Sequence, residues 1–161
     1  MATLTAREID PLALEHQVCF ALATTNRAVL AVYRPLLEPL GLTHPQYLVM
    51  LALWDHRKAA NEPPLSVKQI ATALQMESAT LSPMLKRLEG LGLITRAKNV
   101  IDERTTDVTL TERGIALRER ALEIPPAVVE RLGVELAELE NLHQVLTRIN
   151  AAAVAAGALQ S

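Results

Sequence analysis

The sequence predicts a mainly α-helical chain with one small β-hairpin. It has 161 residues, 50% of them hydrophobic, which is enough for one domain with a proper core. One Trp, two Tyr and one Phe stand against many Leu and Ala residues, and this balance favours packed helices over a sheet sandwich. Apolar residues also recur at helical spacing over most of the chain, whereas strand-like patterns are confined to one short region.

The first two predicted helices flank a turn that contains proline and glycine. Apolar residues about 3.6 positions apart run through residues 14–36, and prolines near the end of this segment are expected to stop the helix. Thr43, with Gln46 three residues later, has the pattern of a capping box, so a second helix should begin near His44. Nearly every residue in 47–54 is apolar, which predicts a helix enclosed on all sides.

Two shorter helices joined by a tight turn follow. Ser66 and Gln69 form a second capping-box pattern, which opens a helix of roughly two turns that ends before a polar break at residues 75–77. In the next helix Pro83 should leave the first turn irregular. The apolar stripe of that helix is Leu81, Leu85, Leu88 and Leu91. This arrangement is a helix-turn-helix.

A hairpin and further helices complete the prediction. Residues 93–96 and 106–110 are expected to be two strands, with a polar tip at 97–105, which makes a β-wing. Thr111 should cap the next helix, which two prolines interrupt. A last helix is predicted over about 127–156, and its Ala-rich end is expected to fray.

The two ends of the chain are predicted to make the contacts of a homodimer. Residues 12–42 and 115–157 carry wide apolar stripes, which a small chain cannot cover alone. A second copy, related by a two-fold axis, is the simplest cover. Within the single unit 1–161, residues 43–111 then form a separate winged helix-turn-helix lobe.

Composition excludes several classes of protein. The net charge of −2 and the 21% of charged residues fit neither a disordered polyelectrolyte nor a generally basic coat protein. No apolar run is long enough to span a membrane, and residues 1–10 lack the pattern of a secretory signal. With a single cysteine, Cys19, no disulfide can form within the chain. We therefore expect a cytoplasmic protein with no membrane partner.

Positive charge is concentrated where the second short helix and the wing lie. Residues 78–104 contain five basic and three acidic residues, whereas residues 112–140 contain four basic and seven acidic ones. Such a local basic region predicts contacts with the phosphates of double-stranded DNA, and a dimer predicts a pseudo-palindromic operator. Thr80 and Ser82 are expected at base edges in the major groove and Arg104 in the minor groove. The remaining expected contacts come from Lys86, Arg87 and Lys98.

Three sequence blocks together resemble a known family. QVCFALATTNRAVLAVYRPLLEPLGLTHPQYLVMLALWD, SATLSPMLKRLEGLGLITR and DERTTDVTLTERG look like the MarR class of winged-helix repressors. More narrowly, they resemble its organic hydroperoxide sensors of the OhrR type with one cysteine, over about residues 12–125. The resemblance implies that the reduced protein represses an operator and that peroxide oxidation of its cysteine releases it. It also implies that Asp102 holds the shape of the wing while Arg104 contacts DNA.

The resemblance assigns the redox site residue by residue. The sensing cysteine corresponds to Cys19, and one tyrosine that hydrogen-bonds it corresponds to Tyr33. A second family tyrosine falls on His44, whose imidazole can also donate to a thiolate, and a helix N-terminus favours its neutral form. Tyr47 is expected in the core or at the lining of this pocket. Ala23 stands where family members often have an aromatic residue, so the packing around an oxidised sulfur differs here.

Spacing adds an independent expectation about this site. Cys19 and Tyr33 are 14 residues apart on one predicted helix, hence about 21 Å apart, and cannot touch within one chain. They can meet only across an antiparallel pair of first helices in a dimer. An oxidised Cys19 has no second cysteine, so it must react with a small thiol or a backbone nitrogen, or oxidise further. The adduct would move the two reading helices from their spacing of about 34 Å.

Other functions fit the residues less well. A repressor released by a small apolar or phenolic ligand, with a structural Cys19, is the main alternative. His16 and Cys19 share a helical face, but two ligands do not complete a zinc site, so no metal or cofactor is expected. No pattern of catalytic residues predicts an enzyme. Residues expected to serve only structure are His56 and His143 at the surface or boundary, and Met50 and Trp54 in the core.

Overall fold

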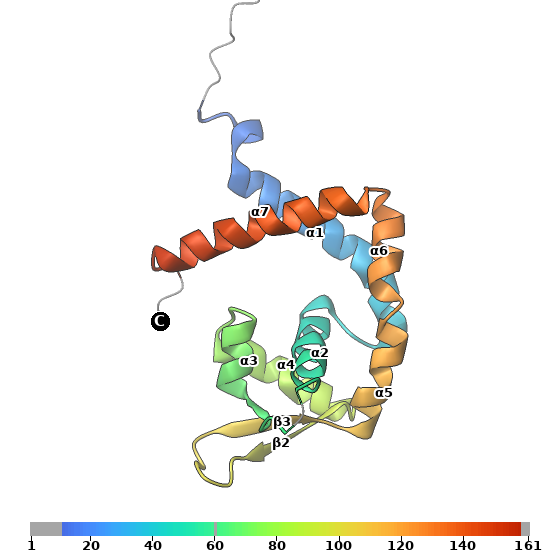
Figure 1. Cartoon of the computed structure of the whole chain (residues 1–161), viewed down its shortest axis with the longest axis vertical. Helices are drawn as coiled ribbons and strands as arrows, with labels where there is room; N and C mark the ends of the chain where they lie inside the picture. Colours follow the sequence, from blue (N-terminus) through green and yellow to red (C-terminus); the bar gives the residue numbers. More distant parts are fainter. Residues whose placement is uncertain (1–10, 60, 159–161) are drawn as a thin grey trace, which may run out of the picture.

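A computed structural model of the chain describes residues 11–59 and 61–158 (Figure 1). The expectation about a secretory signal falls on residues 1–10, outside this range. The fold is mainly α-helical with a small sheet, as predicted. The helices are η1 (Leu14–His16), α1 (Val18–Leu37), η2 (Glu38–Leu40), α2 (His44–His56), α3 (Val67–Ala73), α4 (Ser78–Gly90), α5 (Glu112–Ala121), α6 (Ile124–Leu132) and α7 (Leu136–Ala155). The strands are β1 (Leu65–Ser66), β2 (Ile94–Lys98) and β3 (Thr106–Leu110).

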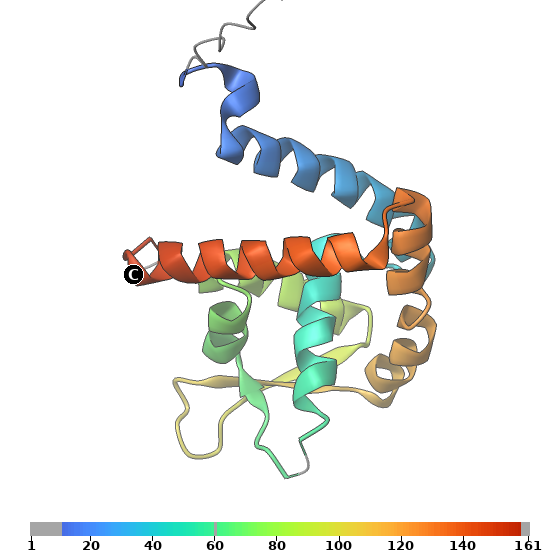
Figure 2. The ribbon, with the colours of Figure 1, turned by 45° about the horizontal axis from the view of Figure 1, so that its top comes forward.

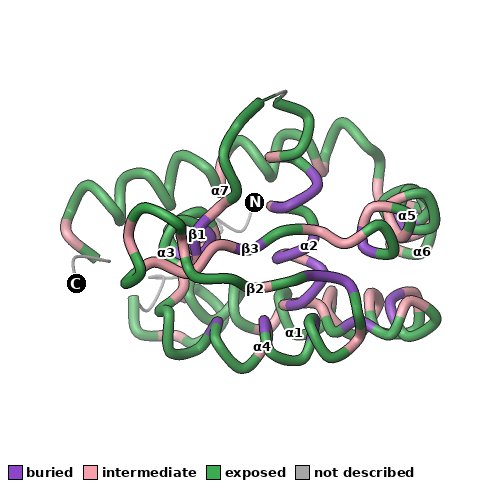
Figure 3. Tube along the Cα trace, turned by 90° about the horizontal axis from the view of Figure 1, so that it is seen from below, coloured by how far each residue is buried: buried purple, intermediate pink, exposed green. Residues whose placement is uncertain are grey.

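One lobe contains α2, α3, α4 and the sheet. The strands lie in the order β1-β3-β2 and both pairs are antiparallel, with Ile94 opposite Leu110 and Lys98 opposite Thr106. The predicted hairpin is confirmed, whereas β1 was not predicted, because two residues are too few for a periodic pattern. Figure 3 shows the buried residues gathered in this lobe. The fully buried side chains include Val49, Met50, Ile70, Leu81, Leu85, Leu88, Ile94 and Val108.

The start of the first helix differs from the prediction. Residues 14–16 form a separate 3₁₀ turn, and the chain is extended at Gln17, with φ −82° and ψ 117°. The α-helix therefore begins at Val18. Pro35 lies in the last turn of α1 without ending it, and the turn into α2 is made at Gly41, whose φ of +73° favours glycine.

The capping boxes predicted for α2 and α3 are both confirmed. The Thr43 backbone N–H donates to the Gln46 side chain at 3.0 Å, and the reciprocal bond is 3.4 Å long. In the second box the Ser66 backbone N–H donates to the Gln69 side chain at 2.8 Å, and the Gln69 backbone N–H donates to the Ser66 hydroxyl at 3.1 Å. The expectation that α2 is enclosed on all sides is wrong in part. Leu51 on its outer face is 40% exposed in the single chain.

The helix-turn-helix is confirmed as α3 and α4. Pro83 lies inside α4, but the first turn is not irregular, since the N–H groups of residues 80 and 81 both bond the carbonyl of Glu77. Leu81, Leu85 and Leu88 of the predicted stripe are buried, and Leu91 follows the helix as its cap. The stripe fixes which face of α4 meets solvent.

The prediction of one final helix is wrong. Residues 124–132 form α6, with proline at its start, and Gly133 then ends that helix in the left-handed conformation with φ +62°. α7 begins three residues later and ends at Ala155, so residues 151–155 of the Ala-rich end are helical. Residues 156–158 follow the helix as a turn, and the rest of this end lies outside the described residues. Thr111 caps α5 as predicted, accepting from the Gly114 N–H at 3.0 Å.

α1 and α7 extend from α6 as two separate arms (Figures 1 and 2). In α1 the buried residue is Leu37, near its end, and α7 contains none. Exposed apolar side chains lie along both arms: Val18, Phe20 and Leu22 on α1, and Leu136, Leu142, Ile149 and Val154 on α7. Across the described residues, no helix combines the length and apolar character needed to cross a membrane.

Candidate functional site

The solvent face of α4 presents the residues predicted to read DNA. Burial of the leucine stripe turns the other face of the helix outward. Thr80 and Ser82 are exposed near its N-terminus, followed by Lys86 and Arg87 one turn further along. Small polar side chains therefore precede two cations on one accessible helix, which is suited to a major groove with phosphates at its edge.

The tip of the wing is held by its own hydrogen bonds. The Asp102 carboxylate accepts from the backbone and the guanidinium of Arg104, both at 3.1 Å. These bonds lower the pKa of Asp102, with the Arg104 side chain as the largest cause. Asn99 accepts from the backbone N–H groups of Ile101 and Asp102 and donates to Asp107. Sequence reasoning missed Asn99, although an Asn at the start of a polar tip is a common turn-forming residue.

An ion pair joins the wing to α4. Arg96 on β2 donates to the Glu89 carboxylate at the end of α4. Arg96 is one of the five basic residues of segment 78–104, and its paired side chain is only 28% exposed. Arg104 also pairs with a carboxylate, that of Asp102, but its side chain is 92% exposed and can still reach DNA. The other accessible cations of this region are Lys86 and Arg87 on the outer face of α4, and Lys98.

Cys19 lies in the first turn of α1 and is exposed in the single chain. Tyr33 follows 14 residues later on the same uninterrupted helix, which puts the two residues about 21 Å apart along the axis. The structure thus keeps Cys19 apart from the tyrosine that the family resemblance pairs with it.

Tyr33, His44 and Tyr47 form a ring cluster where α1 packs against α2. The Tyr33 and His44 ring centroids are 4.8 Å apart in an edge-to-face arrangement, and Tyr47 lies 6.1 and 6.2 Å from them. Burial raises the pKa of Tyr33 and lowers the pKa of His44. The pKa of Tyr47 is raised by burial and then by Tyr33. The neutral imidazole expected from the sequence is thus favoured.

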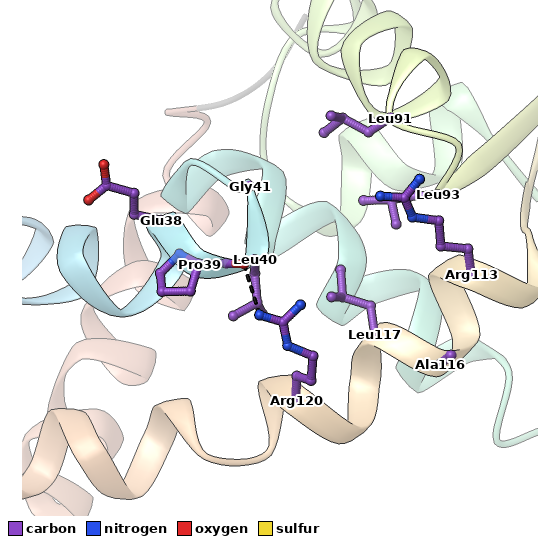
Figure 4. Close-up of a pocket in the computed structure, with 10 residues that line it drawn as sticks. All are labelled: Glu38, Pro39, Leu40, Gly41, Leu91, Leu93, Arg113, Ala116, Leu117 and Arg120. Atoms are coloured by element: carbon purple, nitrogen blue, oxygen red, sulfur yellow. Dashed lines mark hydrogen bonds between the residues drawn. The ribbon is translucent and has the colours of Figure 1, made fainter.

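Two cavities lie beside α5, against η2 and the lobe. One, of about 450 Å³, lies between η2, the turn after α4 and α5, and Arg120 donates across it to the Pro39 carbonyl at 2.9 Å (Figure 4). It contains none of the predicted site residues. The other, of about 530 Å³, is lined by α2, α3 and the α5–α6 region, including Tyr47, Leu51 and Trp54. Within residues 11–59 and 61–158, no three His, Cys, Asp or Glu residues group as metal ligands.

These features define a winged helix-turn-helix DNA-binding regulator. A family model described as the transcriptional regulator SarA/Rot matches residues 31–120. The organic hydroperoxide resistance transcriptional regulator of Bacillus subtilis is 41% identical over 138 residues, which cover 86% of this chain and 88% of that protein. The chain therefore belongs to the MarR-class family of winged-helix transcriptional regulators, which includes this organic hydroperoxide resistance regulator.

AbfR, a protein of Staphylococcus epidermidis, is similar in three solved forms. Reduced AbfR bound to DNA has a TM-score of 0.73 and 32% identity, covering 86% of this chain and 91% of that one. For overoxidized AbfR bound to DNA the TM-score is 0.65 and the identity 34%, and the match covers 84% of this chain and 94% of that one. For the disulfide form the TM-score is 0.58 and the identity 32%, and the match covers 86% of this chain and 88% of that one.

Proposed function

We propose that the protein is a homodimeric repressor that releases a pseudo-palindromic operator when an organic hydroperoxide oxidises Cys19. The observation that carries this proposal is the placement of Cys19 and the Tyr33–His44–Tyr47 ring cluster at opposite ends of α1. If two α1 helices cross antiparallel, each Cys19 meets the ring cluster of the partner subunit. The uncovered apolar faces of α1 and α7 support such a dimer.

The proposed reaction needs only the thiolate and the peroxide. The Cys19 sulfur attacks the terminal oxygen of the hydroperoxide, an S–O bond forms, and the O–O bond breaks. The peroxide is reduced to an alcohol, whose oxygen takes up a proton, and the sulfur is oxidised to a sulfenic acid. A small cellular thiol can then displace water to give a mixed disulfide. The phenol O–H groups and the imidazole N–H group of the ring cluster are suitable hydrogen-bond donors to the sulfur and the leaving oxygen.

α5 offers a route from the thiol to the DNA-binding lobe. Arg120 joins it to the Pro39 carbonyl beside the end of α1, and Trp54 of α2 donates to the Gly114 carbonyl at 2.9 Å. An adduct between the crossed α1 helices would change their angle, and these bonds would pass the change to α4 through α5. When the distance between the α4 helices of the two subunits changes, they no longer fit successive major grooves.

The Cys19→Ser variant tests the redox step. It should bind operator DNA as the wild type does and stay bound after treatment with cumene hydroperoxide and a small thiol, whereas the wild type should be released. Gel shifts measure release, and intact-mass spectrometry of the same samples measures oxygen or thiol addition. Release of the variant by peroxide would place the sensor elsewhere, with methionine oxidation as one source.

A second candidate function rests on the 530 Å³ cavity beside Tyr47. Its lining is mostly apolar, with Leu51 exposed to it, and its volume suits a small phenolic ligand. In that case Cys19 is structural, and salicylate should release both the wild type and the Cys19→Ser variant from DNA. Release by peroxide in the wild type alone favours the redox proposal.

A further inference from the structure

The tip of the wing carries two apolar side chains that no described part of the chain covers. Val100 is 98% exposed and Ile101 is 96% exposed, and they are the most exposed large hydrophobic residues in the described part of the chain. Both belong to the loop between β2 and β3 and are outside the core. Figure 1 shows this hairpin away from the exposed arms. Covering two aliphatic side chains with another surface is favourable because it removes them from water.

The tip is also ordered around these two side chains. Asn99 accepts from the backbone of Ile101 at 2.9 Å and of Asp102 at 3.0 Å, and the backbone of residue 105 bonds both to Asn99 and to Asp102. Val and Ile are stiff at χ1, so little side-chain freedom remains to be lost on contact. The tip therefore presents a preformed apolar surface.

The surroundings of the tip indicate what it contacts. Arg104 follows three residues after Ile101 with a 92% exposed side chain, and the Arg96–Glu89 pair ties the same hairpin to α4. The apolar tip is thus continuous with the DNA-binding face. A minor groove is about 6 Å wide, and its walls are formed by the apolar faces of the sugars. Short aliphatic side chains beside an arginine match that shape.

We propose that Val100 and Ile101 form an apolar wedge that enters the minor groove beside Arg104. This inference rests on the proposed DNA binding and adds a contact that carries no charge. Arginine and lysine release counterions when they bind phosphates, whereas an aliphatic contact does not. The wedge selects DNA by the width and flexibility of the minor groove, because its insertion requires the base-pair steps at the contact to unstack or bend.

The experiment compares two wing variants on a DNA fragment selected from a random-sequence pool by the wild-type protein. Fluorescence anisotropy at several salt concentrations gives the affinity and its salt dependence. Val100→Ser with Ile101→Ser should lower the affinity about a hundredfold, the scale expected for two buried aliphatic side chains, without changing the slope of log K against log salt. Arg104→Gln should reduce that slope by about two, because the dimer carries two copies of the arginine.

Controls separate the wedge from a general defect. Ile101→Val keeps the tip apolar and should lose at most about a third as much affinity as the double variant, since a single methylene is removed. Because both positions are exposed, the double variant should melt at the wild-type temperature. Hydroxyl-radical cleavage should show minor-groove protection by the wild type and Ile101→Val, and weaker protection by the double variant.

Two results would overturn the inference. An unchanged affinity in the double variant would leave the tip without a DNA contact, and this holds also if transcription in cells changes, which would indicate a protein partner. A reduced salt slope in the double variant would mean that the substitution displaced Arg104. If the wild type selects no DNA sequence, the repressor proposal itself fails, and the wedge fails with it.

Discussion

At the residue scale, the close approach of α5 to the strand end explains why a glycine is needed at position 114. It closes the block DERTTDVTLTERG, its N–H bonds the Thr111 cap, and its carbonyl accepts from Trp54. A Cβ at this position would collide with the carbonyl oxygen of Leu93. The absence of a side chain is therefore needed for α5 to approach the strand end and the lobe closely.

We expect Gly114→Ala to lower the free energy of unfolding by about 3 kcal/mol, because backbone atoms cannot move aside as a flexible side chain would. Urea unfolding followed by circular dichroism measures it. Gly90→Ala is the matched control, since a Cβ there meets nothing within 4 Å. The free energy of unfolding of this control variant should rise by about 0.5 kcal/mol, because alanine has a higher helix propensity than glycine. Equal stability of the two variants would contradict the close approach.

His44 should make stability depend on pH. Burial lowers its pKa below the ordinary value of 6.5, so the unfolded chain binds the proton more readily than the folded chain. Stability from this group is fully present above about pH 6.5 and is lost as the pH falls towards the lowered pKa. His44→Gln should flatten the dependence of the urea midpoint on pH between about pH 7 and pH 5. An equal pH dependence in the wild type and the variant would contradict the burial of the imidazole.

At the scale of elements, the sequence predicted best where local chemistry sets the boundary. Thr43, Ser66 and Thr111 cap helices through hydrogen bonds to the residue three positions later. The sequence pattern alone therefore predicts these boundaries. The break at Gly133 was missed because its neighbours keep helical apolar spacing on both sides. The residues of β1 pair with partners 43 and 41 residues away, and Arg96 pairs with Glu89 seven residues away, so no local sequence pattern predicts either contact.

The candidate site was predictable to a similar extent. The exposed face of α4 follows from the leucine stripe, and the family resemblance supplied Cys19, Tyr33 and His44. The structure adds that Tyr33, His44 and Tyr47 meet within one chain, which depends on how α1 packs against α2. The meeting of Cys19 with these rings stays a prediction about the dimer.

The cations of α4 should act through phosphates and not through bases. Lys86→Gln and Arg87→Gln should each weaken binding to all sequences alike and reduce the salt slope by about two, one for each subunit of the dimer. Ser82→Ala should instead change the preferred bases with the slope unchanged. Anisotropy titrations on the selected fragment and on a scrambled one distinguish these results. A loss of sequence preference in Arg87→Gln would assign that residue to base reading.

For the whole molecule, the decisive feature is that the core lies at one end. The lobe holds most of the fully buried side chains, whereas α7 holds none. A helix of 20 residues with no buried residue gains little packing from the described part of its own chain, whereas most helical stability in proteins comes from packing of an apolar face. We therefore expect a second copy to supply the missing surface.

Leu142→Glu should therefore break the dimer. Leu142 is 45% exposed on the apolar stripe of α7, and a carboxylate there would be buried without a partner in a dimer. Sedimentation velocity should show a monomer, and affinity for the selected DNA should fall by about a hundredfold or more because both half-sites must be held. Asn141→Glu, off the stripe, should stay dimeric. A dimeric Leu142→Glu variant would place the interface elsewhere.

The hydrogen bond from Trp54 to the start of α5 has a practical consequence. This residue is the sole indole in the sequence, and it is 5% exposed at the seam between the lobe and the helices that lead to the arms. Any movement of the lobe relative to α5 and α6 alters the polarity around this single fluorophore. The unlabelled protein thus carries its own optical reporter, and stopped-flow emission after mixing with peroxide can time the internal movement separately from the departure of DNA.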